Sequence, residues 1–273
     1  MRITLRPLST GELLDQTFAL YRSHFGLFLG IAAVPYLIYL LLQLAGFGLG
    51  VGIKGGSATP FTAIPMGLLI GISALCLTAA SQAATIVAVS NVYLDRPATV
   101  KDSYSRVMHH IVRVVFLSIT VGLGIGLGFL LLIIPGVIFA AMWAIAVPVK
   151  VLENKAIGDS MSRSSDLTRG DRWRFVAIFA LFGVISIVVS VALNWVISLA
   201  TGVSPDASNA SVGVHALAAF GEFVTDSLIG PLLTIALSLA YYDARVRKEA
   251  FDLEMMMAAI DSPQSGAPVV AAR

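Results

Sequence analysis

Two acidic residues at the start of the last long apolar run are the best candidates for chemistry in this sequence. Glu222 precedes the run that extends from Phe223 to Tyr242, and Asp226 lies inside it. Residues four positions apart lie on the same face of a helix. Acidic side chains are costly inside a membrane and usually serve an ion or substrate path there. Glu222 and Asp226 therefore form a candidate intramembrane polar site.

The depth of this pair separates two interpretations. At about 1.5 Å per residue counted from Tyr242, Asp226 lies roughly 24 Å along the helix, near the outer edge of a hydrocarbon core of about 30 Å. The acids could sit in hydrated headgroups, which is the interpretation we favour. Pro231 could instead kink the helix and open space beside them. A path through the protein would then also use polar residues of other apolar runs, namely Gln82, Ser190 and Asn194.

A second group of candidate residues is charged and lies at the ends of apolar runs. Asp243 and Arg247 follow the last run at positions i and i+4, so they can pair along a helix. We expect a cytoplasmic charge cluster that ties the two chain ends together. Its predicted members are Glu12, Asp15, Arg169, Asp243, Arg245 and Arg247. The alternative is a set of independent solvated charges, each pair contributing at most about 1 kcal/mol.

The sequence lacks the motifs of known catalytic and cofactor sites. It contains no nucleophile elbow, no H-E-x-x-H pair, no phosphate-binding loop and no dinucleotide fingerprint. The longest polar connection is about 20 residues, against the roughly 50 that a catalytic domain needs. Cys76 is the only cysteine, which excludes an internal disulfide and a cysteine-rich metal site. We therefore expect a non-enzymatic protein without a cofactor or metal.

The composition indicates a chain that is surrounded by lipid. Of 273 residues, 57% are hydrophobic and 12% are charged, and the mean hydropathy is +0.87. Soluble domains carry about a quarter charged residues. The net charge of +2 gives no broad basic surface for nucleic acid. Six apolar runs approach the length of about 20 residues that a membrane-spanning helix needs. They cover residues 27–53, 66–93, 112–134, 137–152, 175–200 and 223–242.

The placement of the basic residues predicts the topology. Every Lys and Arg except Lys54 falls on one side of the expected spans, which is the positive-inside pattern of a cytoplasmic membrane protein. Six spans place both termini in the cytoplasm, and the polar residues that follow Arg2 and Arg6 argue against a cleavable signal peptide. Pro135 and Gly136 interrupt the third and fourth runs and predict a tight turn at the outer face. We expect one helical membrane domain, 1–256, and a disordered cytoplasmic tail, 257–273.

Amphipathic segments precede the first, third and fifth spans. Two of them carry apolar residues on one helical face, at positions 14, 18, 21 and 25 and at positions 100, 104, 107 and 111. Each begins with a capping pattern, Ser9-x-x-Glu12 or Thr99-x-x-Asp102. The third, 154–170, is more polar and should pack on the protein. We therefore predict an all-α, polytopic protein of three units, each an interfacial helix followed by a helical hairpin.

Glycines at positions 122, 124, 126 and 128 form two interleaved G-x-x-x-G patterns in the third span. Small residues four apart allow helices to approach closely. Packing against another helix of the same chain is the simpler expectation, and pairing of two copies through this face is the alternative.

Three groups of motifs resemble a known family. The first is LRPLSTGELLD at 5–15 with LYRSHF at 20–25, and the last is YYDARVRKEAFDLE at 241–254. Between them stand IPG at 134–136, Pro148, Glu153 and SSDLTRGDRWR at 164–174. Together they resemble the bacterial glycerophosphoryl diester phosphodiesterase membrane domain proteins of the inner membrane. The resemblance implies a stand-alone membrane domain without the catalytic barrel of its fused relatives, and so it implies no hydrolysis of glycerophosphodiesters.

These observations leave three functional hypotheses. The first is an accessory, scaffolding or lipid-binding protein, whose partners are membrane lipids and a protein at the cytoplasmic face. The second is a small-solute or lipid transporter with a site near Glu222 and Asp226. The third, a lipid phosphodiesterase, rests on the family resemblance alone and ranks last. Loss of function on Glu222→Gln or Asp226→Asn in a folded protein would favour the transporter.

Overall fold

A computed structural model describes residues 8–50, 59–205 and 210–249 of the chain. Within these ranges the chain is helical and contains no strand, which confirms the predicted all-α class. The helices are α1 (Thr10–Ser23), α2 (Phe25–Gly48), α3 (Pro60–Tyr93), α4 (Val100–Met108), α5 (Ile111–Leu131), α6 (Ile133–Met142), α7 (Ala146–Glu153), α8 (Ile157–Thr168), α9 (Arg172–Thr201) and α10 (Val212–Glu249). The predicted tail at 257–273 and Lys54 lie outside the described residues.

Six helical segments of the described chain are long and apolar enough to cross a membrane, as predicted. They are Phe25–Gly48, Ala63–Tyr93, Ile111–Leu131, Ile133–Glu153, Arg172–Thr201 and Val212–Glu249. The fourth combines α6 and α7 across a short break at 143–145. The order of α1, α4 and α8 before the first, third and fifth of these segments also matches the prediction.

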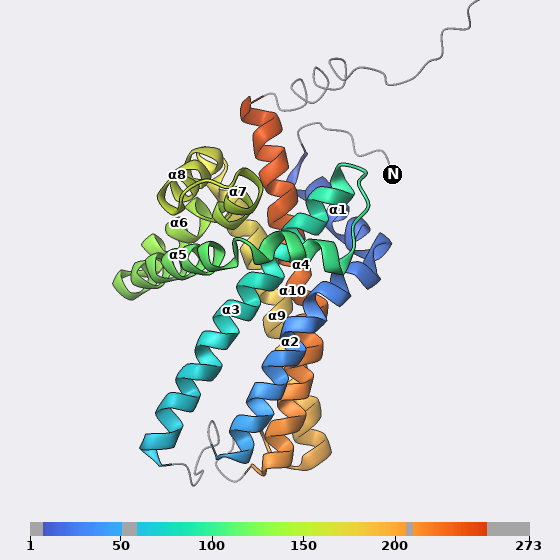
Figure 1. Ribbon diagram of the computed structural model, residues 1–273, viewed down its shortest axis with the longest axis vertical. Coiled ribbons are helices and arrows are strands. Elements are labelled where there is room, and N and C mark those ends of the chain that lie inside the picture. The colour runs from blue at the N-terminus through green and yellow to red at the C-terminus, as the bar shows by residue number, and fades with distance from the viewer. Residues whose placement is uncertain (1–7, 51–58, 206–209, 250–273) are drawn as a thin grey trace, which may run out of the picture.

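The long helices share one direction, and the short helices gather at one end (Figure 1). In this view α2, α3, α9 and α10 run lengthwise, whereas α1, α4, α7 and α8 surround the C-terminal part of α10. Both ends of the described chain lie there. We call this region, which contains α1, α4, α7, α8 and the last turns of α10, the charged end.

The interfacial helices pack on the protein more than the sequence suggests. In α1, Leu13 and Leu20 are buried. Phe18 of α1 and Phe25, the first residue of α2, belong to the predicted apolar face but remain 43% and 41% exposed. Ser9 forms the predicted capping box with Glu12. The apolar face of α1 that meets the protein is thus offset by one residue from the predicted one. Phe18 and Phe25 remain available to lipid.

Two other short helices are held by hydrogen bonds to neighbouring helices. In α4, the Tyr104 hydroxyl donates to the carbonyl of Ile31 in α2 at 2.6 Å. In α8, the hydroxyls of Ser164 and Thr168 donate to the carbonyl of Met142 at 2.9 and 3.2 Å. That carbonyl lies at the C-terminus of α6, where helical partners are missing. The prediction that the third amphipathic segment packs on the protein is confirmed.

The turn between the third and fourth apolar segments differs from the prediction. The prediction of a turn at Pro135 and Gly136 is wrong. The chain reverses direction at Leu132, whose backbone is extended (φ −163°, ψ 154°). Pro135 lies in the first turn of α6, where the missing N–H has no helical acceptor to lose. The α5–α6 hairpin extends sideways from the bundle, across the direction of α10 (Figure 1).

The core is centred on α10, which contacts α2, α3 and α9 and is capped by α1. Its largest fully buried side chains include Phe28, Phe182, Ile235 and Tyr241. Much of the outward surface of α3, α5 and α9 is apolar and exposed, as expected for helices surrounded by lipid. The packed helices α2, α3, α9 and α10 position the first candidate site.

Candidate functional site

A cavity of about 380 Å³ lies among α2, α3, α9 and α10. Hydroxyl and amide side chains from all four helices line it together with apolar ones. The polar lining residues are Tyr36, Ser81, Gln82, Thr85, Ser186, Ser190, Thr225, Asp226 and Thr234. The four packed helices therefore surround a cavity whose polar side chains can form several hydrogen bonds with a bound molecule.

The helical positions of these residues place the cavity within the apolar segments. Thr85 precedes the end of α3 at Tyr93, and Ser190 follows the start of α9 at Arg172. At about 1.5 Å per residue, they lie roughly 12 and 27 Å from the charged end. This range falls inside a hydrocarbon core of about 30 Å.

Asp226 is the one acid in this lining, and the lining contains no Lys, Arg or His. Its side chain is exposed, so the cavity opens to the surface of the bundle. Pro231 lines the same cavity and interrupts the hydrogen-bond ladder of α10 beside it. The site therefore has a negative charge in a largely neutral polar setting.

Of the two acids that the sequence groups together on one face of α10, only Asp226 lines the cavity. Asp226, Gln82 and Ser190 line the cavity, whereas Glu222 and Asn194 do not. Glu222 is exposed at the bundle surface, and the Asn194 amide donates to the Ser190 carbonyl at 2.9 Å. Three of the five residues predicted to line a path therefore line this cavity, and Asp226 is the acid among them.

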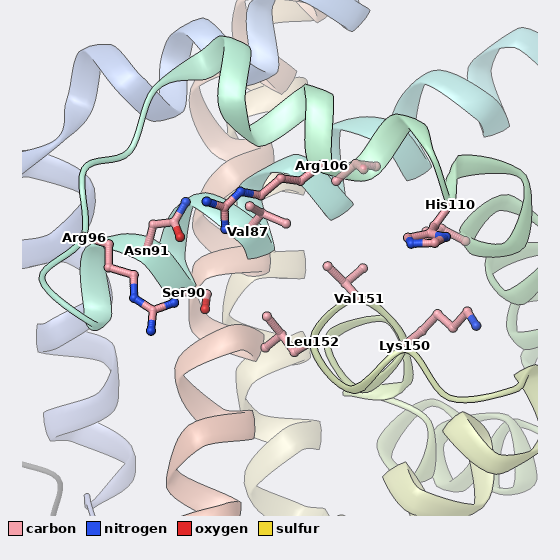
Figure 2. A pocket seen from close by; sticks show the side chains of 11 residues that line it. Val87, Ser90, Asn91, Arg96, Arg106, His110, Lys150, Val151 and Leu152 are labelled. Carbon is pink, nitrogen blue, oxygen red and sulfur yellow. The ribbon is translucent and has the colours of Figure 1, made fainter. Parts of the chain in front are cut away.

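A second cavity, of about 230 Å³, lies at the charged end between α3, α4 and α7 (Figure 2). Its lining includes Arg96, Arg106, His110 and Lys150, together with Asn91 and Ser90. No motif in the sequence singled out His110 or the two arginines as site residues. Lys150 lies within the apolar run 137–152. A lysine inside such a run was the one feature of the sequence that could have indicated this cavity.

Asp243 is the centre of the charge cluster at the end of α10. It is 3% exposed and accepts hydrogen bonds from Arg174 of α9 and from Arg247, the latter at 2.8 Å. The Leu8 amide also donates to it at 2.6 Å, and Arg247 donates to the Leu8 carbonyl. The predicted Asp243–Arg247 pair is present, and it holds the start of the described chain against α10.

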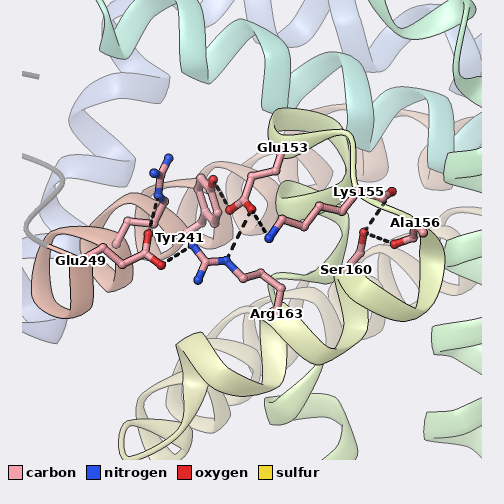
Figure 3. Close-up of polar contacts among 8 residues, drawn as sticks. Glu153, Lys155, Ala156, Ser160, Arg163, Tyr241 and Glu249 are labelled. Atoms are coloured by element: carbon pink, nitrogen blue, oxygen red, sulfur yellow. Dashed lines mark hydrogen bonds and ion pairs between the residues drawn. The ribbon is translucent and has the colours of Figure 1, made fainter. Parts of the chain in front are cut away.

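A second group of charges joins α7, α8 and α10 (Figure 3). Arg163 of α8 pairs with Glu153 at 3.4 Å and with Glu249, and Arg245 pairs with Glu249 at 3.0 Å. The Tyr241 hydroxyl donates to Glu153 at 2.9 Å. Burial alone would lower the pKa of Arg163, but its hydrogen bond to Glu249 and the neighbouring carboxylates raise it above the ordinary value. Arg163 therefore stays charged.

The remaining predicted members of the cluster lie elsewhere. Glu12 caps α1 through the Ser9 amide at 2.8 Å, and Asp15 is exposed on the same helix. Arg169 is exposed and lies 3.8 Å from Asp166. The sequence grouped these residues by charge and side of the membrane. Arg163 and Arg174, which it did not include, are brought in by the packing of α8 and α9.

No protein-family model, curated protein or solved structure matches this chain. No group of three or more His, Cys, Asp or Glu side chains that could hold a metal ion occurs in the described ranges. The chain is an all-helical protein with six segments suited to crossing a membrane, which indicates an integral membrane protein.

Proposed function

We propose that this is a non-enzymatic membrane protein that binds an amphipathic molecule from within the bilayer. The observation that carries the proposal is the polar cavity among α2, α3, α9 and α10, with Asp226 as its acid. A carboxylate at this depth is costly unless water or a positive group accompanies it. A lipid or lipid-like molecule whose head carries an ammonium or hydroxyl group would supply that partner. Its apolar part would remain in the surrounding lipid.

The charge clusters support a binding role over catalysis. The motif residues that resemble the phosphodiesterase membrane domain family include Glu153, Arg174, Asp243 and Arg247, and each of them pairs with another charged group. Paired charges that join helices stabilise a fold, so these four residues are engaged in structural contacts. We therefore propose membership of that family as a stand-alone membrane domain, in a bacterial inner membrane, with both termini in the cytoplasm. An accessory role with a protein partner at that face remains compatible with this proposal.

Transport of the bound molecule is the second candidate. It is favoured by Pro231, because a proline in the cavity wall weakens α10 where a change of access would need it to bend. A transporter would move the molecule across sealed liposomes, whereas a binding protein would retain it without transfer. The measurement of transfer in liposomes separates the two.

The test of binding compares two acids on the same helix. Asp226→Asn removes the acid that lines the cavity, and Glu222→Gln removes the exposed acid outside it. Native mass spectrometry of delipidated protein with added octadecylamine, whose ammonium head carries no phosphate, should show binding weakened about tenfold by Asp226→Asn, because a charge-assisted hydrogen bond is lost. Glu222→Gln should bind like the parent protein. Equal binding by the parent and Asp226→Asn would contradict the proposal.

A further inference from the structure

The cavity at the charged end carries an excess of positive charge. Arg96 follows the end of α3, Arg106 belongs to α4, His110 lies between α4 and α5, and Lys150 belongs to α7. No Asp or Glu is among the residues that line this cavity. Side chains from separate elements thus converge on one space without a carboxylate to balance them.

Within the described part of the chain, Arg96 and Arg106 lack the carboxylate partners that three other arginines of the charged end have. Arg163, Arg174 and Arg247 each pair with a carboxylate. Arg96 and Arg106 form no ion pair with any residue of the described ranges. Figure 2 shows both guanidinium groups directed to the same end of the cavity, where Asn91 and Ser90 lie. Unpaired arginines that point into one hollow are suited to an anion.

Asn91 gives an independent indication of a ligand. It is 3% exposed and lines the same cavity, yet its side-chain nitrogen Nδ2 has no hydrogen-bond partner in the part of the chain that the structure describes. A buried amide donor without an acceptor costs about 1–3 kcal/mol, so such donors are almost always satisfied. An acceptor oxygen bound in the cavity would satisfy this donor.

Unlike the two arginines, Lys150 already has a hydrogen-bond partner within the protein. Its ammonium group donates to the backbone carbonyl of Lys155 at the turn after α7. It lies with His110 at the opposite end of the cavity from Arg96 (Figure 2). Lys150 therefore adds positive potential, and the direct donors are the two arginines and Asn91.

We propose that this cavity is a binding site for a phosphate group, held by the guanidinium groups of Arg96 and Arg106 and by the amide of Asn91. Guanidinium forks match the oxygens of phosphate with two parallel hydrogen bonds, which an ammonium group cannot do. The phosphate belongs to a lipid headgroup or to a soluble phosphate compound. This site is separate from the Asp226 cavity, so it neither requires nor replaces the proposed amphipath-binding function.

The experiment uses the full-length protein in a phospholipid-free detergent and has two arms. In one, inorganic phosphate is titrated by calorimetry. In the other, native mass spectrometry compares phosphatidic acid with diacylglycerol, which has the same tails and no phosphate. Binding of inorganic phosphate identifies a soluble source, and binding of phosphatidic acid alone identifies a lipid headgroup. Both results support the site if they depend on the arginines.

The variants remove the donors and include an arginine change outside the cavity as a control. Arg96→Gln with Arg106→Gln should weaken phosphate binding by about a hundredfold, because two charge-assisted contacts are lost. Arg22→Gln removes one exposed arginine of α1 outside the cavity and should leave binding unchanged. Asn91→Leu keeps a similar volume and removes the donor, so it should weaken binding about tenfold even if the double variant does not fold.

Two results would overturn the proposal. One is a parent protein that ignores inorganic phosphate and binds diacylglycerol as well as phosphatidic acid. The other is a folded double variant, with the thermal midpoint of the parent, that binds either probe with unchanged affinity.

Discussion

Asp243 is the residue on which the charged end depends most. Its carboxylate is almost completely buried and receives hydrogen bonds from Arg174, Arg247 and the Leu8 amide. Burying such a group costs free energy that its partners offset only when they are all present. Removing the carboxylate would leave two guanidinium groups unpaired. The residue therefore joins α9, α10 and the chain before α1 at one point.

We predict that Asp243→Asn lowers the free energy of unfolding by about 3–5 kcal/mol, because it leaves Arg174 and Arg247 uncompensated while conserving side-chain volume. Unfolding in mixed micelles with increasing SDS measures this loss. Asp15→Asn, which changes an exposed acid at the same end, should alter it by less than about 0.5 kcal/mol. A loss below 1 kcal/mol for Asp243→Asn would contradict the structural role.

Two glycines of α5 allow it to pack closely against α6 and the residue that follows α6. A Cβ atom at Gly128 would lie 2.9 Å from the Cα of Gly136, and a Cβ at Gly124 would lie 2.5 Å from the Trp143 ring. At Gly126 nothing lies within 4 Å. The expectation of packing within the same chain thus holds for Gly124 and Gly128. The sequence could not show which of the interleaved patterns faces α6, because that depends on where the turn falls.

Gly128→Ala should therefore destabilise the hairpin by about 1–3 kcal/mol, since the added methyl group meets backbone that cannot move aside. Gly126→Ala is the matched change on the open face. It should be neutral or stabilise by up to about 1 kcal/mol, because alanine favours the helix. The same SDS unfolding series measures both. Equal effects at the two positions would show that α5 and α6 do not pack in this way.

The tip of the hairpin carries large exposed apolar side chains. Leu131, Leu132 and Ile133 are 73%, 69% and 74% exposed. An apolar patch of this kind is stable in hydrocarbon and not in water. A cysteine at Leu132, in a Cys76→Ser background, should react slowly with a membrane-impermeant maleimide in intact vesicles. A cysteine at Ser204, in the α9–α10 connection, is the control, and rapid labelling at Leu132 would place the tip in water.

At the scale of the molecule, hydrophobic runs were enough to predict the number of apolar segments, and amphipathic spacing with capping patterns was enough to predict the order of the short helices. These features follow from lengths and compositions that each segment carries by itself. The two cavities could not be predicted in the same way. They depend on how α3 packs against α2, α4, α7 and α10, so that Arg96, Arg106 and Asn91 meet only in the folded chain. The same limit applies to Asp243 and Arg174, which lie 69 residues apart.

The arrangement predicts that the two chain ends share one side of the membrane. Leu8 and the last turns of α10 are joined through Asp243 and Arg247. The excess of Lys and Arg at this end predicts the cytoplasmic side. Protease-cleavable tags added at either terminus should both resist digestion in right-side-out vesicles and both be cut in inverted ones. Tags found on opposite sides would contradict an even number of crossings.

The most direct test of the central claim is to identify what the protein retains when it is extracted from its own membrane into lipid nanodiscs. Mass spectrometry of the purified particles should find an amphipathic molecule with an amine or hydroxyl head, enriched over bulk lipid in the parent protein and lost in Asp226→Asn. A protein partner in fixed ratio, with no enriched small molecule in either sample, would contradict the account and favour a scaffolding role.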